Sequence, residues 1–455
     1  MKSTYFALTL LFLGIGRQPL AAQETSDPVA EPLTLEQAVA TALERNPWVR
    51  AGKAELEQAE AGLAEAKAGR LPRLSFEETY TNSNNPVFVF GTLLEQGRFG
   101  VQHFDPGFLN APGSIDNFRS TLNVQIPVFN RFKVSSGIRR AKLQREQAGA
   151  QVEWIEQQLR ARVVEAYFGV LVADFRRRVA EEAVKSAEAD LENVRAKVES
   201  GVAVFSDLLA MEVQVADFRR QLVEAEGDLR TAQAALNTLL DRPVEAPVQL
   251  AGSLEDRDFA IPSLPDLLAQ ALRHRPDYRN AERQVEQAEA QLRAARGEYW
   301  PDLNLFASAG RSSYNLTDGS GDFAVGARLS WNLVDFGREP RIRQNLAAVE
   351  AARAQRDQLE QQIRVELVQA LEAVRSARQQ VVLARTAVDR AAEALRIVQD
   401  RYQVGLTTIT EVLRAQTAHL QARFQLLGAR YRHYVSFARL QLATGNLQDV
   451  SWFKD

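Results

Sequence analysis

The chain is most constrained by two segments in which apolar residues alternate with small or polar ones. In Phe323 to Leu333 every odd-numbered position is apolar, and in Phe118 to Val128 every even-numbered position except Ser120 is apolar. A period of two predicts β-strands with one apolar and one polar face. Each segment has 11 residues, and a tilted strand needs roughly 9 to 11 residues to cross a bilayer. The alternation therefore predicts membrane-spanning strands.

A weaker strand candidate precedes each of these segments, opening at Leu74 and at Leu303. The sequence thus predicts four strands, at about 74–84, 118–128, 302–312 and 323–333. Membrane barrels built from one chain begin at about eight strands, and a four-stranded sheet would leave open edges in lipid. If these strands lie in a membrane, several copies of the chain must close the barrel.

The chain contains an internal duplication. Residues 35–76 align with 264–305 without a gap, and Pro47 and Pro72 have counterparts 229 positions later, at Pro276 and Pro301. After the strands the offset falls to 204, as between Gly201 and Gly405, so the first copy carries about 25 extra residues, which we place within 81–117 as a loop. We expect a first repeat over 23–250 and a second over 251–455, each with one strand hairpin.

Long heptad patterns follow each strand pair. Apolar residues step by four and three from Leu159 to Val198, with only Arg177 out of pattern, and again from Ile363 to Tyr402, which is typical of packed coiled helices. No Gly or Pro lies between Pro340 and Gly405, so the second helix extends about 60 residues, or roughly 90 Å. After Gly201 and after Gly405 the chain turns, and a shorter helix runs back along the long one. We expect the short helices near 48–70 and 278–297 to stack end to end with these returning helices.

The N-terminus and the composition exclude several classes of function. Residues 1–22 resemble a secretory signal peptide, since Lys2 precedes an apolar run and Leu20-Ala21-Ala22 forms a cleavage site. The alternative, a membrane anchor, is disfavoured because Arg17 and Pro19 break the run early. The chain has no Cys and a net charge of −3, and it lacks a phosphate-binding loop or a nucleophile constellation. We therefore expect no nucleic acid, catalytic residue, cofactor or metal.

Several motifs together resemble the TolC-like outer membrane efflux protein family. They are the opening LTLEQAVATALERNP with its echo SLPDLLAQALRHRP, the Pro before each first strand, the strand exits IPVFN and WNLVDFG, and the turns VESG and YQVG. The resemblance covers nearly the whole mature chain. It implies a mostly helical fold with a small transmembrane β part: a homotrimer with one twelve-stranded barrel in the outer membrane of a Gram-negative bacterium, continued by a long periplasmic α-helical barrel.

The same resemblance implies a function. The trimer would conduct substrates delivered by an inner membrane transporter, of RND or ABC type, and a periplasmic adaptor (membrane fusion) protein, and it would be embedded in outer membrane lipid. One-step type I protein secretion is the alternative within transport, and the cargo stays open. A non-pore periplasmic coiled-coil protein is the alternative of another class, but it leaves the duplicated strand hairpins unexplained.

The two turns between long and returning helices are the candidate functional sites. At the least, Gly201 and Gly405 are helix C-caps. By resemblance the turns form the periplasmic mouth, where acids repeated around a trimer narrow the pore and attract cations. The predicted gate residues are Asp207, Glu411 and Tyr402, and the predicted adaptor contacts are Gly201, Val202, Ala203, Gly405, Leu406 and Thr407. The sequence departs from the family at Thr407, where some members have a basic residue, and at Arg414, where a second acid can lie.

Two further sets of residues have mainly structural interpretations. His419 and His433 lie fourteen residues apart, or about 21 Å along a helix, which is too far for one metal ion. Aromatic residues near the predicted strand ends fit a belt at the membrane surface: Tyr80, Tyr299, Trp300 and Trp331.

Overall fold

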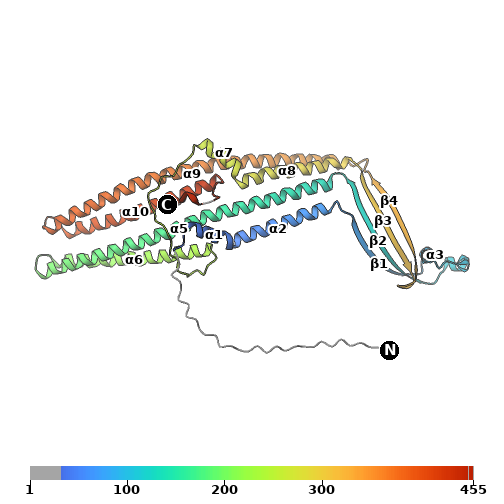
Figure 1. Ribbon diagram of the computed structural model, residues 1–455, viewed down its shortest axis with the longest axis horizontal. Coiled ribbons are helices and arrows are strands. Elements are labelled where there is room, and N and C mark those ends of the chain that lie inside the picture. Colours follow the sequence, from blue (N-terminus) through green and yellow to red (C-terminus); the bar gives the residue numbers. More distant parts are fainter. Residues whose placement is uncertain (1–31, 449, 454–455) are drawn as a thin grey trace, which may run out of the picture.

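The computed structural model describes residues 32–448 and 450–453. The predicted signal peptide, 1–22, lies outside these residues. The protein is a long rod with a four-stranded sheet at one end and two helical hairpins at the other (Figure 1). Within the described residues no helix combines the length and the apolar character that a membrane crossing requires.

The sheet is antiparallel, with strands in the order β1-β2-β3-β4. Its strands are β1 (Arg73–Ser83), β2 (Ile115–Asn130), β3 (Asp302–Ser313) and β4 (Gly319–Ser330). The pairing Phe76↔Leu122↔Ala309↔Phe323 places most apolar residues of the four strands on one face, with Phe306 on the other. Phe76 and Phe323 are largely exposed in the single chain, and the outer edges of β1 and β4 have no partner strand among the described residues.

The position of β4 corrects one prediction. We expected a strand over 323–333, but β4 begins at Gly319 and ends at Ser330, so that Trp331 and Leu333 lie beyond it. Ser330 pairs with Asp302, the first residue of β3. Pro301 comes directly before Asp302 and has no N–H to extend the ladder, so the alternation continues past the point where pairing stops.

The segment between β1 and β2 corrects a second prediction. We expected a loop over 81–117, but it contains α3 (Pro86–Glu95), η1 (Val101–Phe104) and α4 (Pro106–Asn110). Asn85 and Asp105 cap the two α-helices with their side-chain oxygens, and each is followed by Pro at the first helical position. This insertion lies at the far end of the sheet and projects beyond it (Figure 1), with α3 in contact with β3 and β4.

The two longest helices run along the rod. They are α5 (Lys133–Glu199, 67 residues) and α9 (Arg338–Gln403, 66 residues), each about 100 Å long at 1.5 Å per residue. The returning helices are α6 (Phe205–Leu239) beside α5 and α10 (Ile409–Ala443) beside α9. The predicted long helices and their returns are confirmed.

Two short helices complete the wall. α2 (Pro47–Ala68) packs on α5, and α8 (Pro276–Arg296) packs on α5 and α9. The Asn46 side-chain amide donates to the Leu239 carbonyl at 3.0 Å, which joins the start of α2 to the end of α6. The predicted end-to-end stacking is therefore confirmed for the first copy, and Figure 1 shows the same arrangement of α8 and α10.

The main core lies midway along the rod, where α1 (Leu35–Arg45), α7 (Leu264–His274) and the C-terminal η3 (Ser451–Phe453) pack around the long helices. Phe259 and Phe437 stack here with ring centroids 4.0 Å apart. The buried Arg275, at the start of α8, donates to Asp277 at 2.7 Å, to Glu366 at 2.8 Å and to the Ala443 carbonyl at 3.0 Å. These contacts join the start of α8 to α9 and to the end of α10, all within the second copy.

Candidate functional site

The two hairpin turns at the far end of the rod have the same backbone conformation. Gly201 and Gly405 both have φ of 76°, which side-chain-bearing residues rarely adopt. The next residue in each turn, Val202 or Leu406, donates its N–H five residues back, to Lys197 or Arg401, at 2.8 Å. This is the Schellman arrangement that ends a helix with Gly. The predicted C-caps are thus confirmed, and the duplicated sequence produces duplicated turns.

Both turns present apolar side chains to solvent. Val202 is 76% exposed and Leu406 is 72% exposed, whereas Ala203 and Thr407 are half-buried. Phe205, at the start of α6, is also largely exposed. Exposed apolar residues gathered at the end of a rod are typical of a protein-binding surface.

The two predicted gate acids occupy equivalent places with different partners. Asp207 lies in the first turn of α6, and Glu411 lies in the first turn of α10. Glu411 accepts from Arg414 at 2.9 Å. Within the described chain no cation lies at ion-pair distance from Asp207, so only the charge of Glu411 is compensated by a neighbouring residue.

Tyr402 lies where the two hairpins meet. The Lys197 ammonium, from α5, lies 4.6 Å above the centre of the Tyr402 ring, from α9. Burial, together with the negative charges of Asp207 and Asp190, raises the pKa of the Tyr402 hydroxyl. Tyr402 stays neutral at physiological pH and contributes a ring face for the cation.

The sequence did not reveal the other residues that join the hairpins. The Gln416 side-chain amide, from α10, donates to the Asp190 carboxylate, from α5, at 2.6 Å. Burial raises the pKa of Asp190, although the hydrogen bond from Gln416 opposes the shift. Met211 and Ile409 belong to a small apolar cluster against which Tyr402 also packs. Asp190 and Gln416 lie 226 residues apart, and no local pattern marks them as partners.

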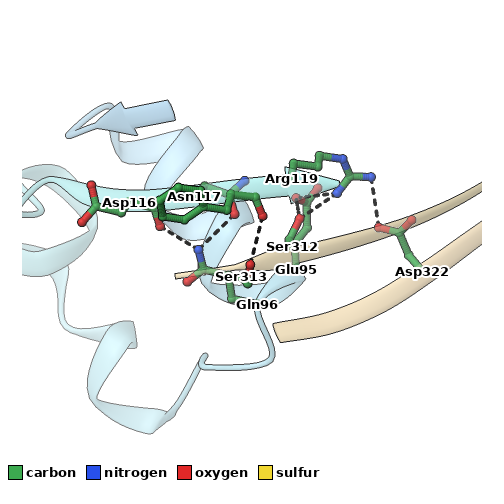
Figure 2. A network of polar contacts seen from close by, with 9 residues as sticks. Glu95, Gln96, Asp116, Asn117, Arg119, Ser312, Ser313 and Asp322 are labelled. Atoms are coloured by element: carbon green, nitrogen blue, oxygen red, sulfur yellow. Dashed lines mark hydrogen bonds and ion pairs between the residues drawn. The ribbon is translucent and has the colours of Figure 1, made fainter. Parts of the chain in front are cut away.

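A polar network closes the opposite end of the rod, where the insertion meets the sheet (Figure 2). Arg119 of β2 donates to Glu95 of α3 at 3.1 Å, to Ser312 of β3 at 2.8 Å and to Asp322 of β4 at 3.0 Å. Arg119, Ser312 and Asp322 all project from the polar face of the sheet, because their strand neighbours Phe118 and Phe323 belong to the apolar face. Arg119 therefore ties the end of α3 to the polar face, and the Gln96 side-chain amide adds bonds to the Asp116 carbonyl at 2.8 Å and to the Asn117 side chain at 3.0 Å.

The remaining predicted residues have structural surroundings. His433 is buried with its ring 5.0 Å from that of Phe259. Burial lowers its pKa, Arg378 lowers it further, and Asp258 and Asp256 oppose the shift. Burial also lowers the pKa of His419. No group of three or more metal-ligating side chains occurs in the part of the chain that the structure describes.

The aromatic residues lie near the ends of the strands. Tyr299, Trp300 and Trp331 are at least half exposed near the start of β3 and the end of β4, and the Trp331 indole donates to the Tyr299 carbonyl at 3.1 Å. Tyr80 lies near the other end of the sheet, where its hydroxyl donates to Asp116 at 2.8 Å. This placement fits the predicted aromatic belt.

The sequence and the fold both have known relatives. The family model described as outer membrane efflux protein matches residues 38–242 and 267–446. The cobalt-zinc-cadmium resistance protein CzcC of Cupriavidus metallidurans is 26% identical over 440 residues, covering 95% of this chain and 94% of CzcC. The alkaline protease secretion protein AprF of Pseudomonas aeruginosa is 25% identical over 434 residues, covering 90% of this chain and 84% of AprF. The outer membrane channel CmeC of Campylobacter jejuni has a TM-score of 0.78 at 18% identity, covering 90% of this chain and 85% of CmeC.

Proposed function

This chain belongs to the outer membrane efflux protein family, and from this premise we propose that it is the exit duct of a tripartite efflux system. It is an outer membrane channel protein and not an enzyme. In the proposed system an inner membrane transporter of the RND or ABC type supplies the energy, and a periplasmic adaptor delivers the substrate to the duct. The observation that carries the proposal is the placement of a membrane-length sheet and two exposed hairpin turns at opposite ends of one rod.

We assign the duct to three copies of the chain. The edges of β1 and β4 have no partner strand within residues 32–448 and 450–453 of the single chain, and open edges do not persist in lipid. Three four-stranded sheets joined through these edges make the twelve-stranded barrel that the family resemblance implies. The proposed repeats, 23–250 and 251–455, then contribute equivalent segments of the wall.

The hairpin turns form the periplasmic mouth in this assembly. Asp207 is the stronger candidate for a charged constriction, because Arg414 compensates Glu411 within the same chain. Lys197 and Tyr402 hold the two hairpins against each other, so opening the mouth requires their contact to separate. Three uncompensated carboxylates around one axis attract cations and repel one another.

Single-channel conductance of the purified trimer in planar bilayers tests the mouth. We expect a small cation-selective conductance in the parent and a larger, less selective one after Asp207→Ala. Glu411→Ala has a smaller effect, since it frees Arg414 as it removes an acid. Glu212→Ala is the matched control, because Glu212 lies five residues along α6 from Asp207, about 140° around the helix.

Two outcomes contradict the proposal at different levels. A large parental conductance that Asp207→Ala leaves unchanged means that the turns do not form the constriction. The absence of any conductance from correctly folded trimers contradicts the duct itself.

The adaptor contacts at Gly201–Ala203 and Gly405–Thr407 have a separate test. Val202→Asp and Leu406→Asp place a charge on the exposed apolar ends of the turns, and we expect cross-linking to the adaptor to fall while conductance is retained. Val382→Asp is the control, because Val382 is also exposed but lies on α9 away from the turns. Equal cross-linking in all three variants refutes the assignment.

Type I protein secretion is the second candidate, supported by the similarity to AprF, which is comparable to that with CzcC. Deleting the gene distinguishes the two, since loss of a secreted polypeptide from the medium favours secretion and increased sensitivity to small toxic solutes favours efflux. A soluble coiled-coil rod is the least supported alternative. Recovery of the protein from the soluble periplasmic fraction would favour it over a channel.

A further inference from the structure

A cavity of about 570 Å³ lies where α5 begins and α8 ends, beside the sheet. Three guanidinium groups line it, from Arg139, Arg293 and Arg296, together with the first-turn residues Ser135 and Ser136 of α5. Phe132 and Trp300 form its apolar side. Cationic and aromatic side chains thus share one cavity at the end of the strands.

One wall of the cavity adjoins the apolar face of the sheet. Phe129 pairs with Leu303, which pairs with Leu329 on the apolar face. The Phe132 ring packs edge-on against Phe129, with centroids 5.4 Å apart. Because Phe132 also lines the cavity, this wall of the cavity is continuous with the apolar face of the sheet.

The cavity is also distant from the edges where copies of the chain meet. The order of helices across the wall is α2, α5, α8, α9, as shown by which helices pack on each other. The cavity lies between the two central helices, α5 and α8, whereas the free edges belong to β1 and β4. A neighbouring subunit joined through those edges leaves the cavity open to the membrane.

The charge around the cavity is unbalanced. Arg139 pairs with Glu286. Arg293 and Arg296 are exposed, and in residues 32–448 and 450–453 no acid lies within ion-pair distance of either. The C-terminal end of α8 carries a partial negative charge from the helix dipole. This partial charge offsets only part of the positive charge of the two arginines. Two uncompensated guanidiniums at one cavity suit an anion that accepts several hydrogen bonds, above all a phosphate.

We propose that this cavity binds the phosphate of an anionic phospholipid from the inner leaflet of the outer membrane. Arg293 and Arg296 donate to the phosphate oxygens, and Phe132 and Trp300 lie against the glycerol and the first carbons of the acyl chains. Trp300 is 58% exposed in the single chain, and tryptophan prefers this depth of a bilayer. The inference rests on the outer membrane location and on the proposed trimer, and it does not depend on the proposed gate.

Native mass spectrometry of the delipidated trimer, with phosphatidylglycerol or phosphatidylcholine added, tests the site. We expect the parent to retain phosphatidylglycerol preferentially and the double variant Arg293→Gln/Arg296→Gln to bind it at least tenfold more weakly. The control double variant Arg230→Gln/Arg390→Gln removes the same charge from exposed arginines on α6 and α9 and should bind as the parent does. Arg293→Lys/Arg296→Lys should recover part of the affinity, since lysine keeps the charge but not the planar fork.

Three results overturn the proposal. They are equal retention of the two lipids by the parent, an equal loss in the control variant, and complete displacement of the lipid by inorganic phosphate at millimolar concentration, which means that the site binds a free anion. The conductance of Arg293→Gln/Arg296→Gln and its response to Asp207→Ala are measured in parallel. An unchanged response shows that the proposed duct stands whether or not the lipid site does.

Discussion

Arg119→Gln tests whether one side chain holds the insertion on the polar face of the sheet. Arg119 reaches Glu95 at 3.1 Å and Asp322 at 3.0 Å, and the three side chains are 34%, 47% and 49% exposed. Pairs this exposed contribute only about 0.2–1 kcal/mol each. Losing both pairs, while Glu95 and Asp322 remain close together, should cost about 1 kcal/mol. A change of this size raises the open population of the insertion about fivefold.

A single reporter thiol measures that population. The chain has no cysteine, and Val89 on α3 is fully buried, so Val89→Cys supplies one protected thiol per chain. We expect a membrane-impermeant maleimide to label Val89→Cys/Arg119→Gln about fivefold faster than Val89→Cys alone, because labelling follows local opening. High salt should speed labelling of Val89→Cys alone and change the Arg119→Gln background much less.

Arg328→Gln provides the matched control. Arg328 also projects from the polar face but lies over the Phe306 ring, 5.6 Å from its centre, rather than between acids. If Arg328→Gln accelerates labelling as much as Arg119→Gln, the total charge on the polar face, and not the contact of Arg119 with α3, controls how often the insertion opens. If neither variant changes the rate, apolar packing and the hydrogen bonds of Gln96 to β2 hold the insertion without Arg119.

Three further predictions concern the helical part. Arg275→Ala should lower the free energy of unfolding by about 2–3 kcal/mol, because it leaves the half-exposed Glu366 and the buried Ala443 carbonyl without their partner. Thermal melting measures this loss. Full recovery of stability by Arg275→Lys would contradict the importance of the forked guanidinium geometry. Because burial lowers the pKa of His433, its neutral form stabilises the fold above about pH 6.5, and this contribution is lost as pH falls through the lowered pKa; melting temperatures should therefore drop less between pH 7.5 and 5.5 in His433→Gln than in the parent. Gly405→Ala should raise amide exchange at its turn about fivefold because φ of 76° costs an L-residue about 1 kcal/mol, whereas Gly428→Ala, inside α10, should leave that exchange unchanged.

Periodicity explains how much of the fold was predictable. Helix and strand patterns repeat over tens of residues, so the length of α9 and the existence of the strands follow from local sequence. The end of β4 did not follow, because pairing stops where β3 begins, at Asp302 directly after Pro301. The helices of the insertion did not follow from the comparison of the two copies, because that comparison shows only how many extra residues the first copy has. The local sequence does signal them, since Asn85-Pro86 and Asp105-Pro106 are ordinary helix starts.

In the candidate site, too, the features set by local sequence were predictable and the contacts between distant segments were not. The glycine turns were predictable because only one residue type adopts that backbone readily. The ion pair between Glu411 and Arg414 is local and three residues apart, so a sequence pattern could have suggested it. The contact between Lys197 and Tyr402 joins helices from different copies of the repeat, and only the packed structure brings those residues together.

The unpaired edges of β1 and β4 also have a genetic consequence. A subunit that folds and pairs normally but cannot open its mouth is still built into the barrel, because the edges and not the turns select partners. In the proposed trimer, a cell that makes equal amounts of normal and blocked subunits obtains about one channel in eight made only of normal subunits. Blocked variants of the turns should therefore be dominant over the wild-type gene, whereas variants that spoil the strand edges should be recessive.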